Sequence, residues 1–444
     1  MKRIGPLDQA LNIVGEVGSR LFDNHVRLAI TGLRRSGKTV FTTAFVHHLL
    51  QAHDLDFMSA AHQDRFLGAR VVDGLGERFP FESFETDLLA EPPRWPEATD
   101  RLTSLRLEMR YRASGFFSSL RSSVQTLVVD IIDYPGEWLL DLPLVATSFA
   151  QLSRDTLALA ERHPRSTVAR EWLDQIENGD TTALIDSYRR YLERCQHELG
   201  LSFVQPGRLM HGLDDLPDGA TFSPVPSRHR LEAEMAHRYE RYVEEVVKPF
   251  YYDHFSNFDR QIVLVDLFTC LNAGPAWFDD SMKALSTILE SFTYGQGSWL
   301  RRLVAPRIDK VLFAASKADH VAANQHPNLK QLLELMVEPA SRRARFEGIS
   351  QDVLALSALR CTDTVTTEHQ GQLLSCVRGK LKNEDRETVL FPGEIPPELP
   401  SDEDWQSGRF RFHDFAPRRL KRRKRGQHVR LDQAIEFLLG DKLA

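Results

Sequence analysis

The sequence has little cysteine and little excess of charge of either sign. Its four cysteines are scattered without a C-x-x-C spacing, so it predicts neither a disulfide framework nor a cysteine-ligated zinc site and favours a reducing compartment. Acidic residues number 62 and basic residues 56, which gives a net charge of −6. That balance argues against binding of polyanions over the whole surface, although it leaves local patches open.

Long hydrophobic runs are missing as well. The most apolar stretches, residues 127–132 and 262–268, are far shorter than the roughly 20 residues that a membrane-spanning helix needs. No uninterrupted apolar segment follows Lys2 and Arg3, so we expect no secretory signal and a cytoplasmic location. The 42% hydrophobic and 27% charged content is typical of a globular protein, and 444 residues predict about three structural units.

Strand and helix patterns alternate along the chain. Apolar residues at three- and four-residue intervals predict an amphipathic helix over residues 7–22. Strands are expected at residues 26–31, 125–133, 261–268, 310–315 and 353–357, and further helices at residues 39–52, 281–292, 329–343 and 431–439. Residues 54–100 show no long periodic segment, and residues 101–110 are predicted to form an edge strand. The alternation predicts a largely parallel sheet, interrupted by the helical periodicity of residues 138–255.

The strongest motif lies between the first strand and the helix after it. Residues Gly32–Thr39 match the phosphate-binding loop pattern of two glycines five positions apart, followed by Lys and by Ser or Thr. Such glycines let backbone N–H groups point at a phosphate, and the helix N-terminus adds partial positive charge. Lys38 is predicted to contact the β- and γ-phosphates and Thr39 to bind Mg²⁺. The other predicted nucleotide contacts in and next to this loop are Gly32, Arg34, Arg35, Ser36, Gly37 and Val40.

A second motif, Asp133–Gly136, follows an apolar strand. A carboxylate at that strand end can reach the shell of a Mg²⁺ ion, and the Gly136 N–H can bind a γ-phosphate. Asp130 is the alternative metal carboxylate, but it lies three residues inside the strand. We therefore predict Asp133 as the metal ligand and Gly136 as the phosphate contact, against the alternative of an ordinary turn.

Two shorter motifs follow later strands. Ser316–Asp319 comes after the strand predicted at residues 310–315, and Ser357–Leu359 comes after another apolar strand about 40 residues on. Taken alone, the first could be a strand end with a solvated lysine and a carboxylate that caps a helix. The order of all four motifs is what favours a nucleotide site.

Together these motifs resemble the YcjX-like family of bacterial stress-inducible P-loop proteins, and the likeness covers nearly the whole chain. It implies a three-layer α/β P-loop NTPase (Ras-like) domain with a large α-helical insertion. The expected division is residues 1–137 for the N-terminal helix and first part of the nucleotide domain, 138–255 for the insertion, and 256–444 for the second part with a basic C-terminal segment.

The resemblance also implies roles for the base-binding motifs. In Ras-like GTPases the carboxylate at the position of Asp319 accepts two hydrogen bonds from guanine, which adenine cannot supply. The aliphatic part of Lys317 would cover the base plane, and Ser316 stands where that pattern has Asn or Thr. Ser357, Ala358 and Leu359 would back the guanine with a main-chain N–H.

Hydrolysis follows from the same comparison. Ras-like enzymes use a glutamine after the D-x-x-G glycine to orient the attacking water, whereas this sequence has Glu137. We therefore expect slow hydrolysis of GTP to GDP and phosphate. Thr99 is predicted as the second Mg²⁺ ligand, with Thr103 as the alternative, and Arg94 as an arginine finger acting in cis. Lys38, Glu137 and Arg94 are thus the predicted catalytic residues.

Other functions and partners stay open at this point. An ATPase would need Asp319 to be unrelated to base recognition, and a nucleotide-stabilised interaction protein would have negligible turnover. An effector or activating protein is conceivable, and no specific nucleic acid is predicted. Residues 418–425 carry seven basic side chains in eight, which could bind an anionic membrane surface, remain solvated, or pair with the acidic residues 398–404. His47 and His48 are expected at the surface rather than as metal ligands.

Overall fold

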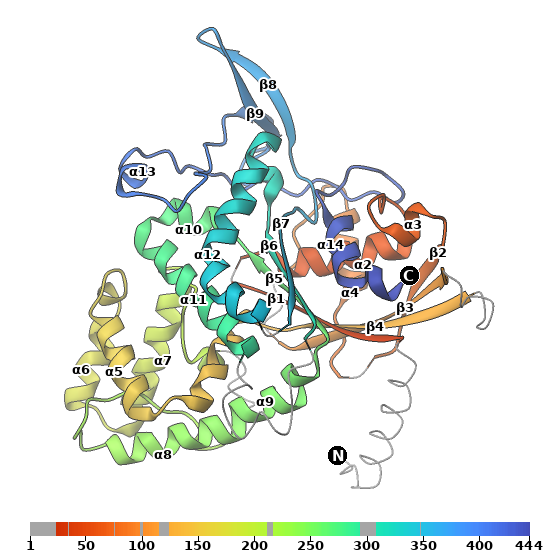
Figure 1. Ribbon diagram of the computed structural model, residues 1–444. Helices are drawn as coiled ribbons and strands as arrows, with labels where there is room; N and C mark the ends of the chain where they lie inside the picture. The colour runs from red at the N-terminus through yellow and green to blue at the C-terminus, as the bar shows by residue number, and fades with distance from the viewer. Residues whose placement is uncertain are drawn as a thin grey trace.

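A seven-stranded, mostly parallel sheet forms the centre of the protein (Figure 1). This computed structural model describes residues 24–33, 35–74, 76–97, 101–114, 124–210, 216–293, 308–346 and 348–444, so the helix predicted over residues 7–22 lies outside the described residues. The strand order is β2-β3-β4-β1-β5-β6-β7. These strands are β1 (His25–Gly32), β2 (Phe66–Val72), β3 (Thr103–Arg112), β4 (Val124–Asp133), β5 (Arg260–Val265), β6 (Lys310–Ala315) and β7 (Ser350–Ala355). All pairs from β4 to β7 are parallel, whereas β2 and β3 run antiparallel to their neighbours.

The expectation of an edge strand at residues 101–110 is wrong. Strand β3 lies between β2 and β4, and the edge is β2, which falls in the section expected to be irregular. Along β3, buried side chains alternate regularly with more exposed ones, and Arg106 on the more exposed face binds Asp130 of β4. Strand β2 escapes detection because it is short and carries Gly68, where the register of its pairing with β3 shifts.

Helices cover both faces of the sheet (Figure 1). On one face, α2 (Lys38–Gln51) and α14 (Leu431–Leu439) pack against the side of β1 that carries Leu28 and Ile30. On the other, α11 (Pro275–Thr293) and α12 (His326–Phe346) share a cluster with Ala29. The strands at the centre are thus buried on both faces, as parallel sheets require. Smaller helices are α3 (Ser59–His62), α4 (Phe81–Leu89), α10 (Leu267–Ala273) and α13 (Asp402–Gln406).

The chain between β4 and β5 is helical. A 3₁₀ helix, Gly136–Ala146, leads into α5 (Phe149–Ala160), α6 (Arg170–Asn178), α7 (Thr181–His197), α8 (Glu232–Tyr242) and α9 (Lys248–Asp253). We call residues 149–253 the helical segment. The Trp172 side chain is fully buried there and stacks on Tyr191, with ring centroids 4.9 Å apart. Phe250 packs on Tyr134, at the end of β4, so the helical segment and the sheet share one core.

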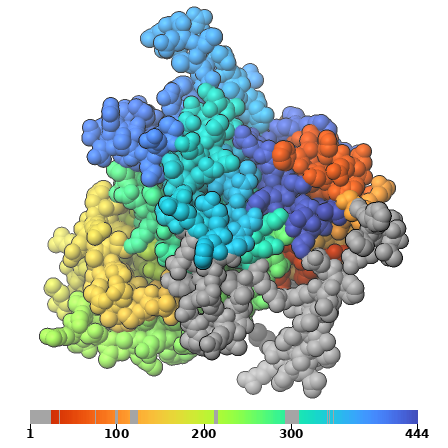
Figure 2. Space-filling model, in the orientation of Figure 1, coloured from red at the N-terminus to blue at the C-terminus, as the bar shows by residue number. Residues whose placement is uncertain are grey.

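A three-stranded antiparallel sheet follows β7, in a region where the sequence predicted no strand. It consists of β8 (Asp363–His369), β9 (Gln372–Lys380) and β10 (Glu387–Leu390). The β8–β9 hairpin projects at the top of the molecule (Figure 2), and the Leu373 side chain near its tip is 76% exposed. Its residues lack an apolar alternation because solvent surrounds much of the hairpin. Among the described residues, the helices are all too short or too polar to cross a membrane.

The basic residues 418–425, called the basic strap below, are fastened to the body of the protein. Arg418 binds Asp363 through two hydrogen bonds of 3.2 and 3.0 Å, and Arg419 forms an ion pair with Glu91. Leu420 is fully buried. The described ion pairs of the strap therefore go to these carboxylates and to Asp56, not to the acidic residues 398–404.

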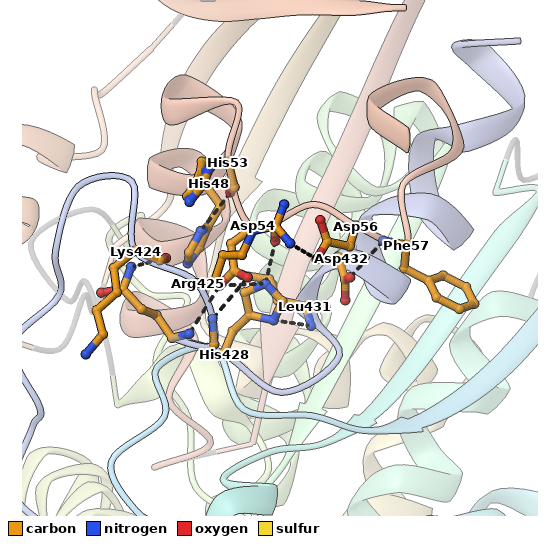
Figure 3. Close-up of polar contacts among 12 residues, drawn as sticks. His48, His53, Asp54, Asp56, Phe57, Lys424, Arg425, His428, Leu431 and Asp432 are labelled. Atoms are coloured by element: carbon orange, nitrogen blue, oxygen red, sulfur yellow. Dashed lines mark hydrogen bonds and ion pairs between the residues drawn. The ribbon is translucent and has the colours of Figure 1, made fainter. Parts of the chain in front are cut away.

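The residues directly after the strap are held by the turn at Asp54 (Figure 3). The Asp54 carboxylate accepts hydrogen bonds from the backbone N–H groups of Gly426 and Gln427, both 3.1 Å long. His428 accepts a hydrogen bond at Nδ1 from the Leu431 N–H, so its Nε2 carries the proton and donates to the Asp54 carbonyl, 2.7 Å away. Ligand atoms of His48, Asp54 and His428 lie within 4.8 Å of one another. A histidine that binds a metal must offer an unprotonated ring nitrogen to the ion, and it normally donates a hydrogen bond from the other. Both ring nitrogens of His428 are already bonded to the backbone, so this cluster connects two chain segments and does not have the bonding of a metal site.

His48 should make the fold sensitive to acid. The surface positions predicted for His47 and His48 are wrong, because both side chains are buried and the His428 ring packs against His48. Burial, together with the repulsion that His428 and His47 exert when they are protonated, lowers the pKa of His48 to about 3. The folded protein holds this ring neutral, whereas the unfolded chain takes up the proton below pH 6.5. Acid therefore favours unfolding, with a contribution of about 3 kcal/mol at pH 4.

Thermal melting between about pH 7.5 and pH 4 measures this contribution. We expect His48→Gln to show a shallower loss of melting temperature with falling pH than the wild type. The same substitution at the exposed His369 is the control and should leave the wild-type pH dependence unchanged. Equal slopes for His48→Gln and the wild type would contradict the prediction.

Candidate functional site

The loop between β1 and α2 has the shape of an anion cradle. Gly37 adopts φ 81°, a left-handed conformation that glycine supplies without strain, and it precedes the first turn of α2, which has no side-chain cap. The Ser36 hydroxyl is buried with no hydrogen-bond partner among the described residues. A helix N-terminus with uncapped N–H groups attracts anions. Arg34, another predicted contact, lies outside the described residues.

Lys38 links this loop to the turn at the end of β4. Its Nζ lies 2.9 Å from the Asp133 Oδ1 atom and donates to the Tyr134 carbonyl, also at 2.9 Å. Asp133 is 1% exposed, so Lys38 balances a buried carboxylate. The parallel pairing of β1 with β4 creates this contact, because both strands end at the same edge of the sheet.

Gly136 lies directly against the phosphate-loop backbone. A Cβ atom at this position would stand 2.4 Å from the Gly32 carbonyl oxygen, closer than atoms in contact allow. Only glycine can occupy this place without displacing one of the two loops. The turn Asp133–Gly136 and the loop Gly32–Thr39 are therefore in mutual contact.

Asp130, the alternative metal carboxylate, has a different task. Although burial opposes its ionisation, hydrogen bonds from Arg106 and His25 lower the pKa of Asp130 to about 2. The Asp130 oxygens lie 2.6 and 2.9 Å from the Arg106 guanidinium nitrogens. Asp130 thus holds the sheet together away from the phosphate loop.

The ends of β5 and β6 bring a second set of charges together. Lys317 adopts φ 59°, and its Nζ lies 2.7 Å from the Asp266 Oδ2 atom. Burial opposes ionisation of this carboxyl, but Lys317 and Thr269 hold the pKa of Asp266 below its usual value. Lys317 also lies 3.5 Å from Asp414, near the C-terminus.

Only one of the two carboxylate oxygens of Asp319 has a hydrogen-bond partner among the described residues. Its Oδ2 atom accepts hydrogen bonds from the backbone N–H groups of Cys361 and Thr362, at 2.6 and 3.2 Å. Its Oδ1 atom is buried and has no hydrogen-bond partner among the described residues. A buried, unsatisfied carboxylate oxygen is costly unless a ligand supplies a donor.

One cavity of about 930 Å³ connects these parts. Residues on its wall that the sequence singled out are Gly32, Arg35, Ser36, Gly37, Lys38, Thr39, Val40, Gly136, Glu137, Ser316, Lys317, Ser357, Ala358 and Leu359. The buried Asp133 and Asp319 are not on the wall, although their neighbours are. Cavities of this size are typical of sites for small molecules and cofactors.

Some predicted residues are not brought to this cavity. Arg94 is an exposed side chain whose guanidinium lies 2.8 Å from Asp87, and it is not on the cavity wall, unlike Trp95 and Pro96 beside it. Thr99 lies outside the described residues. Thr103, the alternative, is buried in β3 next to Asp133.

The wall also contains residues that the sequence did not single out. Three come from α7 and its end, namely Glu193, Gln196 and His197, and Met210 follows later in the helical segment. Lys382, Asp414 and Phe415 come from the C-terminal part of the chain. None of them belongs to a motif with fixed spacing, so only the folded chain reveals their position.

Comparison with known proteins shows the family to which the chain is related. Residues 26–443 match the profile of the YcjX-like family, DUF463. The chain belongs to the YcjX-like family. The match includes all the described strands except the first residue of β1, and therefore every loop at the cavity edge of the sheet.

Two relatives extend the comparison within the YcjX-like family. The "Ras-like GTPase YcjX" of Escherichia coli (strain K12) is 38% identical over an alignment 460 residues long. The alignment covers 97% of this chain and 99% of the relative. The protein of the same name from Shewanella oneidensis is 35% identical over 488 residues, covering 99% of this chain and 100% of the relative. The resemblance expected from the motifs is therefore confirmed at the level of the family.

Proposed function

We propose that the protein is a Mg²⁺-dependent P-loop nucleotide-binding protein that binds GTP and hydrolyses it slowly to GDP and phosphate. The observation that carries the proposal is the cavity of about 930 Å³, which joins the phosphate loop to the loops after β4, β6 and β7. The names of the two relatives, both Ras-like GTPases, support the same reading. In this proposal the helical segment is an insertion into a Ras-like domain.

The phosphate end of the nucleotide would lie at Lys38. The uncapped first turn of α2 and the Ser36 hydroxyl offer donors to phosphate oxygens, and the Lys38 ammonium would exchange the Tyr134 carbonyl for them. Gly136, packed on Gly32, would present its N–H to the γ-phosphate. The arrival of a phosphate would thus change contacts in both loops at once.

The residues near Lys38 also suit Mg²⁺. Thr39 lies on the cavity wall and offers a hydroxyl, and the Asp133 carboxylate lies within 2.9 Å of the neighbouring Lys38 Nζ. Hydroxyl and carboxylate oxygens are hard donors of the kind that Mg²⁺ prefers. When bound, the ion would neutralise charge that builds up on the phosphate oxygens.

The base end would lie between Lys317 and the loop Ser357–Leu359. The buried Oδ1 of Asp319 is an acceptor without a donor, and guanine carries two N–H donors on one edge. Because Asp319 is not on the cavity wall, guanine could reach Oδ1 only if the residues between this atom and the cavity moved aside. Because Asp319 is enclosed in this way, ATP is the second candidate ligand, since adenine could bind without a hydrogen bond to that carboxylate.

The proposal also includes the cellular role, the partners and the domain limits of the protein. The family resemblance supports a stress-related, cytoplasmic role with an effector or activating protein still to be identified. The exposed residues 421–425 of the basic strap support contact with an anionic membrane surface. Domain limits near residues 137 and 255 are part of the proposal, and the ends of β4 at Asp133 and of α9 at Asp253 support them.

Thermal stabilisation by GTP, GDP and ATP in the presence of Mg²⁺ tests the proposal. We expect GTP and GDP to raise the melting temperature by several degrees at millimolar concentration and ATP to raise it much less. A phosphate-release assay would then show hydrolysis of GTP on the scale of tens of minutes, as for Ras-like proteins without activators. If ATP alone stabilised the protein, ATP and not GTP would be its ligand. If no nucleotide stabilised the protein, the proposal would be refuted.

A further inference from the structure

The helical segment contributes side chains to the phosphate end of the cavity. Helix α7 ends there, and its last turn places Gln196 and His197 on the cavity wall, one turn beyond Glu193. The Gln196 side chain is 2% exposed. Buried amides are retained where they have a hydrogen-bonding task, because their desolvation is costly.

That task is a contact with Glu137. The Gln196 Nε2 atom donates to the Glu137 Oε1 atom over 2.9 Å. Glu137 directly follows Gly136 and lies on the cavity wall with it. The hydrogen bond therefore joins the helical segment to the residue that stands next to the γ-phosphate position proposed above.

The backbone of Glu137 is also held from two sides. On one side, Gly136 packs on the Gly32 carbonyl. On the other, a Cβ atom at Gly207 would lie 2.3 Å from the Glu137 carbonyl oxygen, so the helical segment touches the backbone there. The Asp141 carboxylate fixes this second contact by accepting hydrogen bonds from the N–H groups of Gly207 and Arg208, at 2.8 and 3.0 Å. With the backbone fixed, one side-chain hydrogen bond suffices to orient the Glu137 carboxylate.

We propose that Gln196 is a positioning residue for GTP hydrolysis, which orients the Glu137 carboxylate toward the attacking water and so makes the helical segment part of the reaction site. The inference rests on the proposed GTPase function. The water oxygen forms a bond to the γ-phosphorus while the bond from that phosphorus to the β–γ bridging oxygen breaks. The bridging oxygen leaves on GDP with the bonding electron pair, and the water proton passes through Glu137 to the released phosphate.

Gln196→Met tests this role, because methionine keeps the volume of the side chain and removes the amide. We expect the single-turnover rate of GTP hydrolysis to fall about 10- to 100-fold, while the dissociation constant for GTP changes less than about threefold. In a Glu137→Ala background the same substitution should have no further effect on the rate. The matched control is Gln151→Met, on the exposed face of α5 and away from the cavity, which should hydrolyse GTP at the wild-type rate.

A second variant, Gln196→Glu, gives a readout that a structural role would not produce. Two carboxylates at hydrogen-bond distance share a proton, so the pair would become fully ionised only at higher pH. The rising limb of the pH–rate profile should then move up by about one pH unit or more relative to the wild type. The other charged or titratable groups near the pair, common to both proteins, are Glu193 and His197 on α7, Lys38 on α2, Asp133 on β4 and Arg208.

The outcomes separate the two proposals. A Gln196→Met rate within about twofold of the wild type, an additive effect with Glu137→Ala, or an unmoved pH profile would overturn the role of Gln196 and leave the GTPase function intact. If the wild type binds GTP without hydrolysing it, the role of Gln196 and turnover fail together while nucleotide binding stands. Melting temperatures of all variants show whether a slow rate reflects loss of fold.

Discussion

Lys38→Ala is expected to abolish stabilisation by GTP and to lower hydrolysis by about 100-fold or more. The substitution removes the cation that would face the β- and γ-phosphates. It also leaves the Asp133 carboxylate, 1% exposed, without the ammonium group 2.9 Å away. Loss of the cation weakens the binding of nucleotide. Loss of the partner of Asp133 lowers the stability of the protein even without nucleotide.

The two losses can be told apart by comparing variants with and without nucleotide. Lys38→Ala in an Asp133→Asn background restores charge balance at the buried site, so its melting temperature without nucleotide should recover part of the loss. Its response to GTP should stay absent. Lys330→Ala, on the half-exposed side of α12, is the control and should keep the full response. A normal GTP shift in Lys38→Ala would contradict the position proposed for the phosphates.

Asp319→Asn is expected to exchange guanine for xanthine as the preferred base. The backbone N–H groups of Cys361 and Thr362 can donate only to an oxygen, so they fix the asparagine with its oxygen in the place of Oδ2. The asparagine amide then takes the place of Oδ1 and presents donors where guanine also presents donors. Affinity for GTP should fall about 100-fold, and xanthosine triphosphate, which has an acceptor at the corresponding edge, should gain.

Competition of the two nucleotides for the purified variant measures this exchange. Asp385→Asn, at a fully exposed position in the β9–β10 connection, is the matched control and should retain the wild-type order. An Asp319→Asn protein with unaltered preference for GTP would show that this carboxylate serves only the backbone of residues 361–362. In that case ATP becomes the stronger candidate ligand.

Local motifs were sufficient to predict the sheet edge that carries the site. The loops after β1, β4, β6 and β7 could be placed together because parallel strands end at a common edge, and the structure brings Lys38, Lys317 and Ser357 to one cavity there. The strands at the centre were predictable for a related reason, since they are short apolar runs buried on both faces.

Contacts between distant segments could not be predicted in the same way. Gln196 reaches Glu137 only because the helical segment folds back on the end of β4. His48 looked like a surface residue because His428, whose ring packs against it, lies 380 residues further along the chain. Neither relation leaves a pattern in spacing or composition, since each depends on which segments pack together.

The order of strands in the sheet has a consequence for synthesis of the protein. Strand β1 lies between β4 and β5, and residues 134–259 separate these two neighbours in the chain. The cavity wall extends from Gly32 to Phe415, and α14 covers β1 after that. A ribosome therefore releases the phosphate loop long before its surroundings exist, and nucleotide cannot guide the folding of the first half. A fully formed nucleotide site therefore requires a chain synthesised at least as far as Phe415.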